Sequence, residues 1–287
     1  MKIIAILLVL TLLLLPAASM ATQINTAVSF YPIYLFTQNV LNGVEGFELS
    51  MLTPPNGGCL HDYQLLTGDM RMLAESDVLL INGAGMEDGF LPQIMRQLPN
   101  LTVIDLSVGI DVIEDEHGVN AHIWLDPKNA VIMVHNIADA CVSLSPENEA
   151  LIRANEQTYT EKLIALDQTL AESLQSTQNK NIATFHEAFP YFAKAYGLNA
   201  VASVTLDPDE APSPRELIEV IDKIATASPC PLFSEPGVDS DALKTVAQET
   251  GEKVYTLDPV TSGDGALDEY ETKMLGNLET LLQALNP

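Results

Sequence analysis

The stretch SPENEALIRANEQTYTEKLIALDQTLAESLQSTQ (residues 145–178) decides the fold, because it is long, uninterrupted and apolar along one face. Ser145 suits the cap of a helix and Pro146 its first position. Apolar residues then recur at three- and four-residue spacing: Tyr159, Leu163, Leu166, Leu170 and Leu174. A helix of about 30 residues is roughly 45 Å long, which is more than one domain needs internally. We therefore predict a rigid spine that joins two lobes.

Strand-like and helix-like segments alternate on both sides of this spine. Before it, the patterns predict strands at 26–30, 47–52, 77–81 and 101–106 and helices at 32–41, 67–76 and 127–144. After it, they predict strands at 181–185, 199–204, 231–234 and 253–257 and helices at 187–196, 213–227, 239–250 and 267–285. Such alternation is typical of mostly parallel sheets covered by helices. We expect two α/β lobes of similar size with a cleft between them.

The first 21 residues have the pattern of a secretory signal peptide. Lys2 gives a positive start, an apolar run follows at 3–15, and Ser19 and Ala21 place small residues before a cleavage site. No Cys stands near that site, so we expect no lipid attachment there. The predicted organisation is a signal peptide at 1–21, an N-terminal lobe at 22–144, the linking helix at 145–178 and a C-terminal lobe at 179–287.

The charge balance excludes some partners. The chain has 39 Asp plus Glu against 13 Lys plus Arg, and loss of Lys2 with the signal would take the net charge from −26 to −27. Such a surface repels nucleic acid and anionic membranes, and its simplest role is solubility. The three cysteines, Cys59, Cys141 and Cys230, allow at most one disulfide, and the sequence does not say which two would pair.

Polar side chains stand at the ends of several predicted strands: His61, His122, His186, Glu235 and Asp258. Ligands of open α/β sheets bind beyond the carboxyl ends of the strands. If the two lobes face these ends toward one another, the cleft holds three imidazoles and a carboxylate, a four-coordinate nitrogen and oxygen shell that suits Zn²⁺. Each residue alone is better explained as structural or as a helix or turn cap, and spacing alone does not choose between Glu235 and Asp258.

Several sequence blocks resemble one family. They are SFYP (29–32), CLHDYQL (59–65), HIWLDP (122–127), FHEAFPYF (185–192) and LDP (257–259), in order over nearly the whole mature chain. They are similar to blocks of the extracytoplasmic substrate-binding proteins of zinc and manganese ABC importers. The resemblance implies two pseudo-symmetric lobes, joined by a long backbone helix, with the metal between them.

The resemblance also assigns the metal ligands. His61, His122 and His186 match the imidazole ligands of zinc-type members, and Asp258 matches the carboxylate in the fourth position. Manganese-type members carry Glu where His186 stands, so the resemblance indicates zinc, in line with the softness of the ligands. Glu235 matches no ligand block, which leaves it to orient a ligand or to lie on the surface.

Two departures from the family pattern bear on the site. Many zinc-type members carry a long His-rich loop before the second ligand block, whereas this chain has only the short acidic segment 114–119, with His117. Some members have a disulfide in the second lobe, where this chain has Cys230 alone. Cys59, two residues before His61, is either a further metal neighbour or a packed or reactive thiol. His135, inside a predicted helix, is interpreted as structural.

We therefore predict an exported, periplasmic or otherwise extracytoplasmic protein that captures Zn²⁺ with high affinity and delivers it to an ABC importer permease. We expect a monomer that is not an enzyme and binds no nucleic acid. One alternative is a carrier of Mn²⁺ or Fe²⁺ with the same fold. Another is an exported zinc hydrolase, which would need an open metal position and a general base, although His-Glu-x-x-His is absent.

Overall fold

The computed structural model describes residues 23–54, 60, 63–115, 118–205 and 211–286. The expected signal peptide, Cys59, His61 and His117 lie outside the described residues. Within the described part, no helix is both long enough and apolar enough to span a bilayer.

The first sheet has four parallel strands: β1 (Ile24–Val28), β2 (Phe47–Met51), β3 (Val78–Ile81) and β4 (Thr102–Asp105), in the order β2-β1-β3-β4. The helices of this lobe are α1 (Tyr31–Val40), α2 (Thr67–Ala74), α3 (Leu91–Gln97) and α4 (Pro127–Leu144). Parallel strands buried on both faces read as unbroken apolar runs, as in β3. Helix α3, which begins beside a Pro, was not predicted from the sequence.

The second sheet repeats this design. Its parallel strands are β7 (Asn181–His186), β8 (Asn199–Thr205), β9 (Leu232–Ser234) and β10 (Val254–Thr256), in the order β10-β9-β7-β8. Its helices are α6 (Pro190–Tyr196), α7 (Pro214–Ala227), α8 (Asp241–Thr250) and α9 (Glu269–Leu285). Numbered along each lobe, both sheets have the strand order 2-1-3-4. The expected pair of similar α/β lobes is therefore confirmed.

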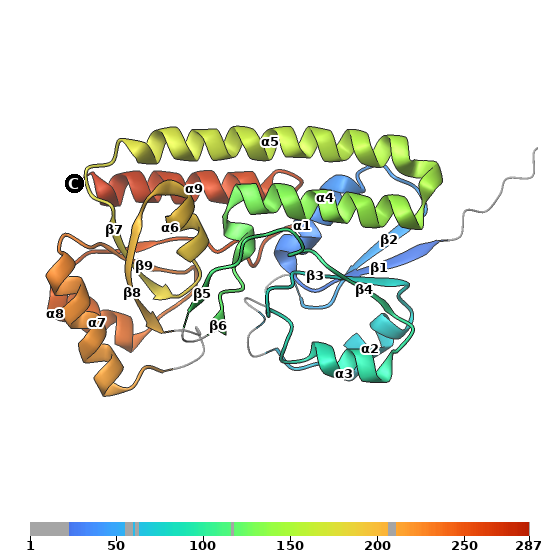
Figure 1. Cartoon of the computed structure of the whole chain (residues 1–287). Coiled ribbons are helices and arrows are strands. Elements are labelled where there is room, and N and C mark those ends of the chain that lie inside the picture. The colour runs from blue at the N-terminus through green and yellow to red at the C-terminus, as the bar shows by residue number, and fades with distance from the viewer. Residues whose placement is uncertain (1–22, 55–59, 61–62, 116–117, 206–210, 287) are drawn as a thin grey trace, which may run out of the picture.

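The long helix α5 (Glu149–Gln175) joins the lobes, and it runs alongside α4 in the first lobe and alongside α9 in the second (Figure 1). Its first residue, Glu149, directly follows the short 3-10 turn Pro146–Asn148. Its predicted apolar stripe is buried at all five positions, from Tyr159 to Leu174. A small antiparallel hairpin, β5 (Glu114–Asp115) with β6 (Gly118–Val119), lies between the two sheets (Figure 1).

The helix predicted at 187–196 begins later than expected. Helix α6 starts at Pro190, because Pro has no N–H and a fixed φ that suit the first helical turn. The residues between His186 and Pro190 form a turn instead, and this turn contacts the first lobe.

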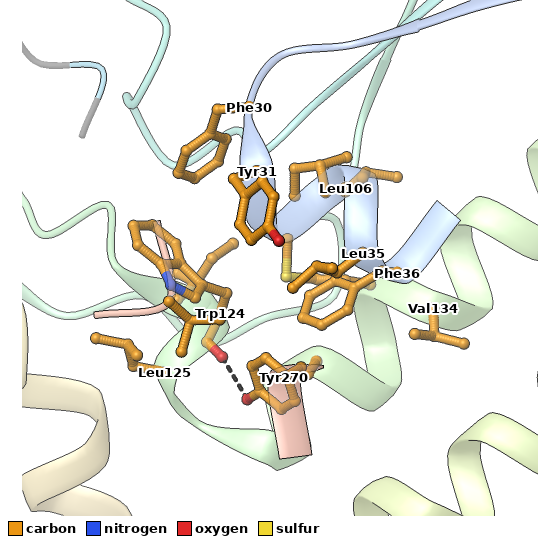
Figure 2. Close-up of a cluster of buried hydrophobic side chains, with 14 of the residues drawn as sticks. Phe30, Tyr31, Leu35, Phe36, Leu106, Trp124, Leu125, Val134 and Tyr270 are labelled. Carbon is orange, nitrogen blue, oxygen red and sulfur yellow. Dashed lines mark hydrogen bonds between the residues drawn. The ribbon is translucent and has the colours of Figure 1, made fainter. Parts of the chain in front are cut away.

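The main core runs through both lobes and includes the fully buried Trp124. The Trp124 ring packs edge-on against Phe30, with 5.0 Å between ring centroids, and Phe36 packs edge-on against Tyr270 at 5.1 Å. Figure 2 shows these rings together, with the hydroxyl of Tyr270 donating to the carbonyl oxygen of Trp124 over 2.7 Å. Since Tyr270 lies in α9, this bond ties the last helix to the loop that carries His122.

Candidate metal centre

His186 is the last residue of β7, and its side chain is fully buried. Glu235 follows directly after β9, the neighbouring strand, so the two side chains meet at the same sheet edge. Its carboxylate oxygen Oε1 lies 2.7 Å from Nδ1 of His186. A carboxylate accepts hydrogen bonds and does not donate them, so Nδ1 of His186 carries a proton, and in the neutral ring Nε2 carries the lone pair.

His122 comes from the first lobe and stands before the 3-10 turn Ile123–Leu125. Its side chain is 2 % exposed, and its ring centroid lies 4.7 Å from that of His186, at an interplanar angle of 69°. The Asn120 side-chain oxygen Oδ1 accepts from the backbone N–H of His122 over 3.1 Å and lies 3.2 Å from its Nδ1. Two imidazoles from different lobes therefore meet, and each has an oxygen acceptor at Nδ1.

Asn120 also binds the second lobe. Its side-chain amide donates to the backbone carbonyl of Glu187 over 2.9 Å, and its own carbonyl accepts from the Tyr191 hydroxyl over 2.8 Å. The Tyr191 oxygen in turn accepts from the N–H of Ile113. The residue that orients His122 is thus fixed to the turn that follows His186, which sets the distance between the two imidazoles.

Asp258 follows β10 and enters a loop bound to the first lobe. The indole N–H of Trp124 donates to the carbonyl of Pro259 over 2.8 Å, which places Asp258 next to the His122 loop. The Asp258 carboxylate accepts from the N–H of Val260 over 2.7 Å and from the ammonium of Lys273 over 2.6 Å. Val260 has a φ of +61°, a conformation that costs energy for a β-branched residue and is typical of functional loops.

The structure brings together two of the four predicted ligands. His122 and His186 are adjacent, His61 lies outside the described residues, and Asp258 holds Lys273. Within the described residues, no three His, Cys, Asp or Glu side chains form a group able to hold a metal ion. The predicted four-ligand set therefore stays a prediction.

The other candidate residues lie apart from this pair. His135 is exposed on α4 and lies 2.7 Å from Glu156 and 3.3 Å from Asp139, consistent with a structural role. Cys141 and Cys230 are buried free thiols, and burial raises the pKa of each to about 12. Both are therefore protonated at neutral pH and poor metal ligands.

A buried carboxylate in the first lobe was missed by the sequence reasoning. Glu87 is 1 % exposed and accepts from the N–H groups of Asn82 and Gly83, just past the end of β3. The Asn82 side chain then donates to the carbonyl of Ala121, the residue before His122. Burial raises the pKa of the Glu87 carboxyl to about 7, although hydrogen bonds from Ser29 and the two N–H groups oppose that rise. The sequence signal for this site was an acidic residue six positions after the last residue of a buried strand.

Two parallel α/β lobes, a connecting helix and imidazoles that meet between the lobes define a two-lobed ligand-binding protein. The chain belongs to the family described as zinc-uptake complex component A, periplasmic, whose model matches residues 27–284. It is a metal-binding substrate-binding protein of the ABC-transporter class and not an enzyme, so the hydrolase alternative is excluded.

Relatives of known description bind different metals. The manganese ABC transporter substrate-binding lipoprotein PsaA of Streptococcus anginosus is 28 % identical over 248 residues, covering 81 % of this chain and 80 % of its own. The zinc-binding lipoprotein AdcA of Streptococcus pneumoniae is also 28 % identical, over 91 % of this chain and 54 % of its own. A ZnuA crystal structure has a TM-score of 0.80 at 26 % identity, with 92 % and 100 % coverage. FpvC of Pseudomonas aeruginosa with Mn²⁺ has a TM-score of 0.83 at 26 % identity, with 92 % and 98 % coverage.

Proposed function

We propose that this protein is an exported Zn²⁺ carrier, which binds the ion between its lobes and delivers it to the permease of an ABC importer. The observation that carries the proposal is the pair His122 and His186, buried and 4.7 Å apart, each from a different lobe. Oxygen acceptors at both Nδ1 atoms favour the tautomers whose lone pair is on Nε2, the form in which an imidazole can bind a metal ion.

The proposed shell adds His61 and Asp258 to these two imidazoles. Three neutral imidazoles and a carboxylate form a tetrahedral site that favours Zn²⁺ over Mn²⁺, because Mn²⁺ prefers oxygen ligands. The Oδ2 atom of Asp258 accepts from the ammonium of Lys273, so Lys273 and the metal ion would compete for this carboxylate.

The organisation proposed for delivery follows the predicted boundaries. A monomer with lobes at 22–144 and 179–287, linked by 145–178, would present the loaded site to the permease after cleavage behind Ala21. AdcA and PsaA are described as lipoproteins, whereas the first Cys of this chain is Cys59. We propose that the mature protein is extracytoplasmic.

The test is a competition titration of metal-stripped protein with Zn²⁺ and with Mn²⁺ against a chromophoric chelator. We expect a one-to-one complex, with Zn²⁺ preferred. His122→Ala and His186→Ala should each lower the Zn²⁺ affinity at least about 100-fold, because each removes a direct ligand, more than the 10- to 100-fold typical of residues that only support a ligand. The matched control is His135→Ala, which removes an exposed imidazole and should leave the affinity unchanged.

Two outcomes would contradict the proposal. A preference for Mn²⁺ would make this chain a manganese carrier, the specificity stated for PsaA. Equal Zn²⁺ affinity in His186→Ala and in the His135→Ala control would move the site away from the imidazole pair.

A further inference from the structure

Lys273 places a positive charge at the carboxylate that the proposed Zn²⁺ site needs. Its ammonium lies 2.6 Å from Oδ2 of Asp258, and the two side chains are only 19 % and 23 % exposed. The sequence blocks that suggested the ligands do not include Lys273, which lies on α9, 15 positions after Asp258.

The rest of the Asp258 environment is built to hold this residue in place. The side chain of Asn277, one turn further along α9, accepts from the N–H of Asp258 and donates to its carbonyl, both over 2.7 Å. The N–H of Val260 donates to Oδ1. Because the backbone and Oδ1 are fixed by other groups, Lys273 is not needed to position the carboxylate.

Lys273 also has a second carboxylate within reach. Oε1 of Glu269, one helical turn earlier, lies 3.9 Å from the Lys273 ammonium. Glu269 accepts from the Tyr31 hydroxyl over 2.5 Å and from the N–H of Gly265 over 2.8 Å, so it is anchored to the first lobe. Glu269 can therefore serve as the ion partner of Lys273 when Asp258 does not.

We propose that Lys273 is a built-in competitor of the metal ion for Asp258 and sets the affinity and the release rate of the site. An ammonium and a divalent ion at one carboxylate repel each other, so binding of the ion displaces Lys273 toward Glu269. On release the ammonium returns and neutralises Asp258, which lowers the free-energy cost of losing the ion. This inference rests on the proposed function and adds a residue that weakens binding.

The experiment compares Lys273→Met, which keeps the length and removes the charge, with Lys273→Arg, which keeps the charge. Zn²⁺ affinity is measured by chelator competition, and the dissociation rate by stopped-flow transfer of Zn²⁺ to excess chelator. We expect Lys273→Met to bind about 5- to 150-fold more tightly, the usual range for coupling between two sites, and to release the ion more slowly. Lys273→Arg should stay near the unaltered protein. Lys162→Met, on exposed α5 surface, controls for the change in net charge.

A second comparison separates competition from positioning. In an Asp258→Asn background, Lys273→Met should change the affinity no more than Lys162→Met does, because the carboxylate for which the lysine competes is gone. Weaker or unchanged Zn²⁺ binding by Lys273→Met, in protein with unaltered circular dichroism and thermal unfolding, would overturn the inference and make Lys273 structural. That outcome leaves the proposed function intact, whereas an unaltered protein that binds neither Zn²⁺ nor Mn²⁺ would overturn both.

Discussion

At the scale of single residues, the orientation of His186 depends on Glu235. The carboxylate fixes the tautomer of the ring, and its negative charge makes Nε2 a stronger electron donor toward a metal ion. At His122, the neutral amide oxygen of Asn120 lies in the corresponding place, 3.2 Å from Nδ1. The two imidazoles are therefore unequal, and we expect His186 to be the stronger ligand.

Glu235→Gln should lower the Zn²⁺ affinity about tenfold, because the amide oxygen can still accept from Nδ1 but the charge is lost. Chelator competition measures the affinity. Glu249→Gln, which removes an exposed carboxylate from α8, is the matched control and should have no effect. If the two variants bind Zn²⁺ equally well, Glu235 does not act through His186.

Glu87 gives the stability of the fold a pH dependence. The pKa of Glu87 is raised from 4.5 to about 7 in the folded protein. The stabilisation linked to this shift is therefore fully present below pH 4.5, the pKa of the unfolded chain, and is lost as the pH rises through 7. A rise from 4.5 to about 7 corresponds to about 3 kcal/mol. From pH 5 to pH 8 the unaltered protein should therefore lose stability relative to Glu87→Gln, which has no carboxyl at this position to ionise. Urea unfolding at both pH values measures it, and a pH-independent difference would contradict the assignment.

The sequence predicted the two imidazoles of the candidate site but not the contacts that orient them, because those contacts depend on the tertiary fold. His122 and His186 were found because they stand at the ends of apolar runs. The roles of Asn120, Glu235 and Lys273 depend on which strands are neighbours and on how the lobes meet. Glu235 and Lys273 lie 49 and 15 positions from their partners, and Asn120 lies 67 positions from its second-lobe contact at Glu187. Local patterns carry no information on such contacts. The strand-end pattern named both Glu235 and Asp258, and the resemblance to a family chose Asp258. No local pattern would have indicated its lysine partner.

At the scale of elements, α5 was the most predictable part of the fold, because one buried stripe repeats over its whole length. Strand positions were also predicted, since buried parallel strands are short apolar runs. Short elements were missed or misplaced: α3 has seven residues and one fully buried side chain, too little for a periodic signal. The start of α6 depends on Pro190, which the apolar pattern alone did not weigh.

The α5 stripe should account for much of the stability of the joined lobes. Leu170→Ala, at a fully buried position, should lower the free energy of unfolding by about 2–5 kcal/mol, because it leaves a cavity between α5 and its neighbours. Ile164→Ala, at a position on the same helix that is 45 % exposed, should change it by less than about 0.5 kcal/mol. Chemical denaturation gives both values. Similar costs for the two variants would contradict the burial pattern.

At the scale of the whole molecule, the loop after Asp258 is hydrogen-bonded to the first lobe. Hydrogen bonds from Trp124, Gln38 and Asn39 reach its carbonyl groups at Pro259, Gly265 and Leu267. The His186 and Glu235 pair instead lies on the second sheet. If the lobes tilt, we expect His186 to leave the site first, while His122 and Asp258 stay together. The long helices α5 and α9, packed side by side, favour a small tilt over a wide opening (Figure 1).

The most direct test of this account is the position of the metal ion in crystals of the Zn²⁺-loaded protein, found from anomalous scattering at the zinc edge. We predict one strong peak between the lobes, about 2.0–2.1 Å from Nε2 of both His122 and His186, with the Asp258 carboxylate in its shell. Zn²⁺ found only at acidic surface positions, with none between the two imidazoles, would contradict it.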